Sequence, residues 1–138
     1  MLHLVTRYFG LRTLAMLLSA ITVAGCATLP PAQPARDLKA VAGKWEGTVY
    51  LRGGQMFSAT MTINEDGTWE IITPAPPAGP QLGPRFVGSM IVVDGKYRYK
   101  SETTGLTGTC TLHEGDGKRV FVRVADDGSH YSEFRPAK

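Results

Sequence analysis

Cysteine is scarce in this chain of 138 residues, which contains only Cys26 and Cys110. Because we expect Cys26 to be modified, as argued below, Cys110 has no partner for an intramolecular disulfide. The chain also lacks a CxxC pair, and the one crowded turn with metal-binding residue types, 113–116, is more typical of a solvated charged loop. We therefore predict no metal and no cofactor, and we interpret Cys110 as a buried, inert thiol.

An excess of charge of one sign is also absent. The formal net charge is +3, but Arg7 and Arg12 lie in a segment that we expect to be removed, which leaves 13 cationic against 12 acidic residues. This balance gives no electrostatic case for binding nucleic acid. Helix-forming residues are scarce after residue 43, which argues against a helical bundle.

Recognisable catalytic motifs are missing as well. No serine lies in a Gly-x-Ser-x-Gly context, no Cys–His pair has a recognisable setting, and no glycine-rich loop precedes a helix. The sequence therefore predicts no catalytic residues and a protein that is not an enzyme.

The one long apolar run lies near the N-terminus, from Leu14 to Ala24, and follows the cationic Arg7 and Arg12. This order, ending in small residues, is typical of a secretory signal peptide. The run is shorter than the about 20 apolar residues that a transmembrane helix needs. We predict that residues 1–25 form a signal-peptide helix that is removed.

The tetrapeptide Val23-Ala24-Gly25-Cys26 resembles the lipobox of bacterial lipoproteins. In that family the cysteine thiol receives a diacylglyceryl group, and a further acyl chain such as palmitate is usually added after cleavage. The resemblance implies that Cys26 is lipidated and that its acyl chains anchor the protein to a membrane. In the Gram-negative pattern, Ala27 after the cysteine implies the outer membrane, with the protein facing the periplasm.

The rest of the chain divides into a linker and one domain. Residues 26–36 are rich in proline and predict a stiff, extended tether between the anchor and a domain at 37–138. Residues 37–42 are expected to form one helical turn, with Asp37 as its N-cap. The proline-rich segment 74–84 is expected to be a long surface loop, with a lid role possible.

After Gly43 the chain shows repeated alternation of apolar and polar residues, separated by turns that contain glycine. This pattern predicts antiparallel strands with one buried face. We expect eight of them, at residues 44–52, 56–64, 68–74, 85–93, 96–101, 106–113, 118–125 and 129–135.

The turns predict which residues share a face. Asp94-Gly95 is a two-residue hairpin signal, and we assign three-residue loops to 52–54, 65–67, 115–117 and 126–128. These lengths predict that Val120, Val122 and Val124 face inward, whereas Phe121 and Arg123 face outward.

Eight strands in sequence order predict an all-β, antiparallel up-and-down meander that closes into a small barrel, since closure removes exposed edges. The chain here is similar to the lipocalin and avidin group, because Gly43-Lys44-Trp45 resembles the Gly-x-Trp of the first lipocalin strand. Lipocalins place an arginine from near the chain end against that tryptophan. Arg135 lies at a suitable position, but the predicted turn lengths place its side chain on the outer face of the sheet. We therefore do not assign it that role. The resemblance concerns the fold of residues 39–136.

The predicted inward set is rich in aromatic residues, and it admits two interpretations. One is a cavity that holds a small ligand, with Trp45, Trp69, Tyr97, Tyr99 and His130 as the candidate binding residues. The other is a filled core that only stabilises the barrel. The full inward set is Trp45, Val49, Leu51, Phe57, Ala59, Met61, Ile63, Trp69, Ile71, Met90, Val92, Tyr97, Tyr99, Leu106, Cys110, Leu112, Val120, Val122, Val124, His130 and Phe134.

Two functions follow as hypotheses. The first is a lipid-anchored, non-enzymatic binding module of the cell envelope that holds a small apolar or amphipathic ligand. The alternative is a protein–protein interaction or inhibitor-type module that acts through its outer surface. The alternative depends on apolar residues predicted to face outward, namely Ile72, Val87, Ile91, Val93, Phe121 and Tyr131.

Overall fold

The computed structural model describes residues 28–74 and 85–138. The predicted signal peptide, Cys26 and nearly all of the predicted 74–84 loop lie outside these residues. The described part contains no helix and nine strands: β1 (Ala32–Gln33), β2 (Gly43–Leu51), β3 (Met56–Ile63), β4 (Thr68–Ile72), β5 (Arg85–Val93), β6 (Lys96–Ser101), β7 (Thr107–Gly115), β8 (Lys118–Ala125) and β9 (His130–Pro136). Each of the eight predicted strands matches one of β2–β9 to within two residues at either end.

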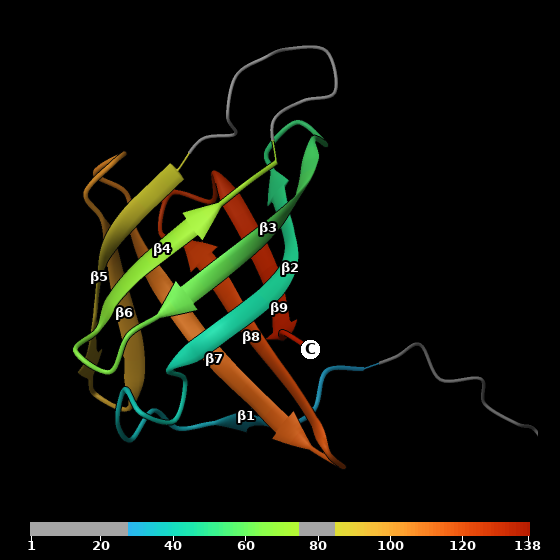
Figure 1. Cartoon of the computed structure of the whole chain (residues 1–138), viewed down its shortest axis with the longest axis vertical. Helices are drawn as coiled ribbons and strands as arrows, with labels where there is room; N and C mark the ends of the chain where they lie inside the picture. Colours follow the sequence, from blue (N-terminus) through green and yellow to red (C-terminus); the bar gives the residue numbers. More distant parts are fainter. Residues whose placement is uncertain (1–27, 75–84) are drawn as a thin grey trace, which may run out of the picture.

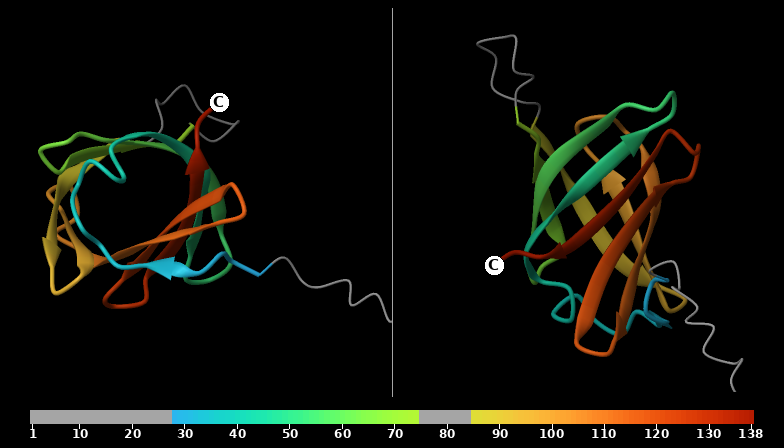
Figure 2. Two further views of the ribbon diagram at one scale, coloured as in Figure 1. Left: turned by 90° about the horizontal axis from the view of Figure 1, so that it is seen from below. Right: turned by 90° about the vertical axis from the view of Figure 1, so that its right-hand side faces the viewer.

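Strands β2–β9 form a closed antiparallel barrel (Figures 1 and 2). Each strand pairs with the next along the chain, and β9 closes the ring by pairing with β2. The predicted fold class, an all-β up-and-down barrel, is therefore confirmed. The short β1 was not predicted. It pairs with Leu112 and His113 of β7, which lie beyond the β7 residues that pair with β6.

Most of the predicted turns are confirmed by the strand register. Asp94-Gly95 forms a two-residue turn in which both residues have positive φ, at 50° and 71°. The 52–54 loop has three residues, because the Leu51 N–H donates to the Gln55 carbonyl at 2.8 Å. At the 65–67 loop the Asn64 N–H donates to the Thr68 carbonyl at 2.9 Å. These turns keep the inward faces of β2–β6 in the predicted phase.

The predicted phase of β8 is wrong. Asp116 and Gly117 alone form the β7–β8 turn, with φ of 52° and 73°, so that Gly115 pairs with Lys118. A two-residue turn with both φ positive matches the twist of the flanking strands, which favours it over a three-residue loop. Phe121 consequently faces the interior and is fully buried, whereas Val124 is 44% exposed. Val120 and Val122 are buried too, but they lie outside the main core cluster.

The next loop compensates for this shift. The β8–β9 connection has four residues, 126–129, instead of the predicted three, and Val124 lies opposite Tyr131. Because one loop is shorter by a residue and the other longer by a residue, β9 keeps its predicted face. His130 and Phe134 therefore point inward as expected, while Arg123 joins them on the inner face.

Residues 30–42 close one end of the barrel. The Trp45 indole N–H donates to the Val41 carbonyl at 2.9 Å, and the Tyr97 hydroxyl donates to the Asp37 carbonyl at 2.9 Å. Ala35 and Val41 are buried in the core cluster. The predicted tether is therefore wrong for residues 30–36, which pack on the barrel. Residues 37–42 form a turn and not a helix, although Asp37 accepts the Ala40 N–H at 2.9 Å as a cap would.

An arginine does pack against Trp45, and it comes from β8. The guanidinium carbon of Arg119 lies 5.3 Å from the centroid of the Trp45 ring, and its Nη2 donates to the Ala40 carbonyl. Arg135 is exposed and pairs across the sheet with Glu46. We did not predict the contact between Arg119 and Trp45, because the predicted three-residue β7–β8 turn placed Arg119 on the outer face of β8.

Candidate functional site: a cavity at the open end of the barrel

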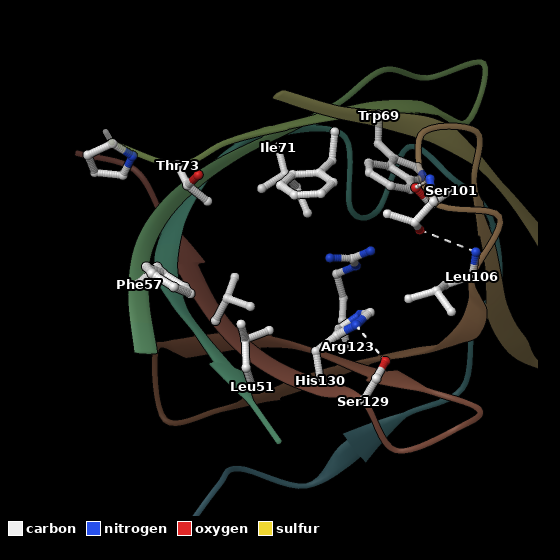
Figure 3. Close-up of a pocket in the computed structure, with 14 residues that line it drawn as sticks. Leu51, Phe57, Trp69, Ile71, Thr73, Ser101, Leu106, Arg123, Ser129 and His130 are labelled. Carbon is white, nitrogen blue, oxygen red and sulfur yellow. Dashed lines mark hydrogen bonds between the residues drawn. The ribbon is translucent and has the colours of Figure 1, made fainter. Parts of the chain in front are cut away.

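A cavity of about 510 Å³ occupies the barrel interior at the end opposite to β1 (Figure 3). Its apolar walls are Val49, Leu51, Phe57, Trp69, Ile71, Pro74, Phe86 and Leu106. Its polar lining residues are Thr73, Ser101, Thr104, Arg123, Ser129 and His130. Phe57 is 38% exposed, so the cavity reaches solvent at this end. Apolar walls with a few polar groups are typical of small-molecule sites.

The five predicted binding residues divide between two levels of the barrel. Trp69 and His130 line the cavity, and the Tyr99 ring contacts both of them, with ring centroids 6.1 Å apart in each pair. Trp45 and Tyr97 belong instead to the closed-end core, where both pack against Phe121, with ring centroids 5.4 and 5.9 Å away. The interior is thus partly filled and partly hollow, and the interpretations of a filled core and of a cavity each describe one end.

Two glycines position the aromatic rings below the cavity. Gly88 lies opposite Trp69 in the register, and Gly108 lies opposite Tyr99. A Cβ on Gly88 would come within 2.4 Å of the Trp69 ring, and a Cβ on Gly108 within 2.4 Å of the Tyr99 ring. Because both glycines lack a side chain, the two rings can lie against the barrel wall and leave the space above them open.

Arg123 lies at the centre of the site. Its side chain extends from β8 into the middle of the cavity (Figure 3), yet the residue is only 4% exposed. The guanidinium carbon lies 4.2 Å from the centroid of the Tyr99 ring and 4.8 Å from that of Trp69. Contacts of this kind between a cation and an aromatic face are favourable by about 0.5–2 kcal/mol each. Sequence reasoning placed this residue outside the barrel.

His130 and Tyr99 form a hydrogen-bonded pair beside the arginine. The Tyr99 hydroxyl lies 2.8 Å from His130 Nε2, and Ser129 Oγ lies 3.4 Å from His130 Nδ1. Burial, together with the nearby Arg123 charge, lowers the pKa of His130 below its ordinary value, while Asp127 opposes this shift. Burial also raises the pKa of Tyr99 to about 12. Both side chains are therefore neutral at pH 7.

Cys110 is buried beneath the cavity, as the sequence predicted. It lies directly opposite Arg123 in the β7–β8 register and is 1% exposed. Burial raises the pKa of its thiol to about 12, although Arg123 acts in the opposite direction. The thiol is therefore protonated at neutral pH, which matches the interpretation of an inert cysteine.

The loop that carries Ser129 and leads into His130 is braced from outside the barrel. Asp126 accepts hydrogen bonds from Arg98 at 2.5 and 2.8 Å and from the Thr107 hydroxyl at 2.8 Å. The hydrogen bonds from Arg98 and then from Thr107 lower the pKa of Asp126 to about 2. The brace links the start of the β8–β9 loop to β6 and β7.

The crowded turn at 113–116 is occupied by interactions within the protein. Glu114 forms an ion pair with Arg119 at 3.1 Å, and His113 Nδ1 lies 2.9 Å from the Pro30 carbonyl oxygen. Across residues 28–74 and 85–138, no three His, Cys, Asp or Glu side chains gather in a way that would hold a metal ion.

The predicted outward apolar set is present only in part. Ile72, Ile91 and Val93 are 47%, 58% and 41% exposed, and Val87 and Tyr131 are half-buried. Phe121 was wrongly included, because the shifted phase of β8 turns it into the core.

Comparison with known proteins gives no family assignment. No family model matches the chain, and no curated protein matches it. A solved redesigned β-barrel aligns with a TM-score of 0.48 and 12% identity, over 75% of this chain and 97% of that one. In the described part of the chain, no helix is both long and apolar enough to cross a membrane.

Proposed function

We propose that this protein is a lipid-anchored, non-enzymatic binding module of the cell envelope that holds a small apolar or amphipathic ligand in the open end of its barrel. The observation that carries the proposal is the cavity of about 510 Å³ with apolar walls. Ligand sites in proteins range from about 300 to 1,000 Å³ and are mainly apolar with a few polar groups. The opposite end of the barrel is filled by Trp45, Tyr97 and Phe121, so stability does not require the cavity to be filled.

The state of the polar groups in the cavity supports binding in preference to catalysis. A nucleophile needs a lowered pKa or an adjacent base that accepts its proton. Two hydroxyl groups hydrogen-bond to His130: that of its chain neighbour Ser129, at a long 3.4 Å, and that of Tyr99, at 2.8 Å, whose pKa is raised to about 12. Such a phenol is a poor nucleophile at neutral pH.

The attachment of residues 30–35 supports an orientation for the anchored protein. The Glu114 N–H donates to the Pro31 carbonyl at 3.0 Å, which fixes this segment at the closed end. Four residue steps from Cys26 to Pro30 span at most about 14 Å. If acyl chains on Cys26 enter the membrane, the closed end lies near the bilayer and the cavity opens away from it.

The proposal is tested by filling the cavity. Leu106 lines it and is half-buried, so Leu106→Trp is expected to occupy ligand space. Ile72→Trp is the matched control, because Ile72 is 47% exposed on the outer face. Proteins purified under mild conditions are examined by native mass spectrometry, and the released small molecules are identified.

A small apolar or amphipathic molecule bound to the wild type and to Ile72→Trp, but not to Leu106→Trp, is the expected result. The proposal is overturned if both tryptophan variants retain that molecule equally, or if none of the proteins binds a molecule or takes up an added apolar fluorescent dye. In the second case the outer surface becomes the preferred site of function.

A further inference from the structure

Arg123 is a buried cation without a counterion. The ion pairs among the described residues are Arg85–Glu70, Arg98–Asp126 and Arg119–Glu114, and none of them includes Arg123. Every Asp and Glu of the chain lies within residues 28–74 and 85–138. Segments 1–27 and 75–84 therefore hold no carboxylate side chain that could pair with it.

The acidic groups that touch Arg123 do not supply a negative charge either. Cys110 lies opposite it on β7 and Tyr99 lies against its guanidinium, and each has a pKa of about 12. His130 is neutral or cationic, never anionic. At neutral pH the cavity thus carries one uncompensated positive charge.

Hydrogen bonding around Arg123 is also incomplete. Its Nε is buried and has no hydrogen-bond partner. The same holds for Oγ of Ser132, which lies directly opposite Arg123 on β9 and is fully buried. The Tyr99 and Trp69 rings stabilise the guanidinium charge, but an aromatic face does not replace the oxygen acceptors that five guanidinium N–H groups prefer. Buried polar atoms without partners in a native protein call for an explanation, and a ligand is one.

We propose, on the basis of the binding function above, that the natural ligand is an amphipathic anion whose carboxylate binds Arg123 and whose apolar body fills the cavity. A planar carboxylate matches the donor pattern of a guanidinium, and a charge-assisted bond of this kind is strong when water is excluded. The cavity that Arg123 lines also has apolar walls that include Leu51, Phe57, Phe86 and Leu106, and Arg123 is 4% exposed whereas Phe57 is 38% exposed. The acidic head group therefore lies deep in the barrel and the apolar chain extends toward the mouth.

The test uses the full chain in phosphatidylcholine vesicles at mildly alkaline pH. The probes are dodecanoate, dodecanol and dodecylamine, each with a photoactivatable diazirine at the far end of its chain. After irradiation, mass spectrometry measures the labelling of peptides that line the cavity mouth. The ratio of acid to alcohol labelling is compared between the wild type, Arg123→Met and Arg135→Met. Arg135 is an exposed arginine on β9, so its variant removes the same charge without changing the cavity.

The wild type and Arg135→Met are expected to be labelled roughly tenfold or more by the acid relative to the alcohol, and least by the amine. In Arg123→Met the preference reverses, because the carboxylate then has no partner for its charge. Circular dichroism verifies that Arg123→Met is folded; if it is not, the comparison of the three probes on the wild type decides by itself.

Cavity labelling by the alcohol that equals or exceeds labelling by the acid in the wild type overturns this inference and leaves the proposed binding function intact. An acid preference that survives in folded Arg123→Met also overturns it. Absence of cavity labelling by every probe overturns the binding function, and the inference with it.

Discussion

Replacing Phe121 and Val124 separately by alanine tests the β8 register on which the site depends. Phe121 is fully buried between Trp45 and Tyr97, with ring centroids 5.4 and 5.9 Å away, whereas Val124 is 44% exposed. Removing a buried phenylalanine side chain costs about 3–5 kcal/mol, because the lost burial adds to the cavity that remains. Removing a half-exposed valine from a strand costs about 1 kcal/mol or less.

The free energy of unfolding is measured for each variant by urea denaturation, followed by tryptophan fluorescence and circular dichroism. Trp45 packs directly on Phe121 and reports the loss of the closed-end core. If Phe121→Ala is too unstable to purify, Phe121→Leu retains most of the apolar volume and should cost less. A larger loss for Val124→Ala than for Phe121→Ala would refute the register and, with it, the placement of Arg123 inside the barrel.

Three further predictions follow from the site. Gly108→Ala should cost about 1–3 kcal/mol of unfolding free energy, because its Cβ would lie 2.3 Å from a backbone oxygen and 2.4 Å from the Tyr99 ring. Gly115→Ala in the same strand is the control: its Cβ would lie 3.2 Å from the nearest atom, so its cost in urea denaturation should be clearly smaller. The lowered pKa of His130 means that protonation opposes folding, so stability should be greatest above the ordinary value of 6.5 and fall as the pH decreases below it; thermal unfolding of His130→Gln should show a flatter profile between about pH 7 and 5. Cys26→Ser should abolish incorporation of labelled palmitate and release the protein from the membrane fraction, whereas Cys110→Ser should retain both; unchanged membrane association of Cys26→Ser would contradict the anchor.

The positions of the strands and of most turns could be predicted from local chemistry. Alternating residues mark strands such as β3, and Asp94-Gly95 adopts the backbone conformation that a two-residue hairpin requires. The candidate site was harder to predict, because a set of inward aromatic residues suits a core as well as a ligand cavity. Trp69 and His130 line the cavity, whereas Trp45 and Tyr97 pack around Phe121 at the closed end, and nothing in the alternation distinguishes the two levels.

The sequence by itself determined the all-β meander, its strand boundaries and the inward faces of β2–β7 and β9, since these depend on period-two patterning and turn residues. Only the tertiary structure decided the face of β8. Two loop assignments on either side of that strand preserve the rest of the barrel equally well. One of them turns a row of valines toward the interior, whereas the other turns Phe121 and Arg123 inward. The preference of Asp116-Gly117 for a two-residue turn and the packing of Phe121 against Trp45 favour the second, which brings a cation into the cavity.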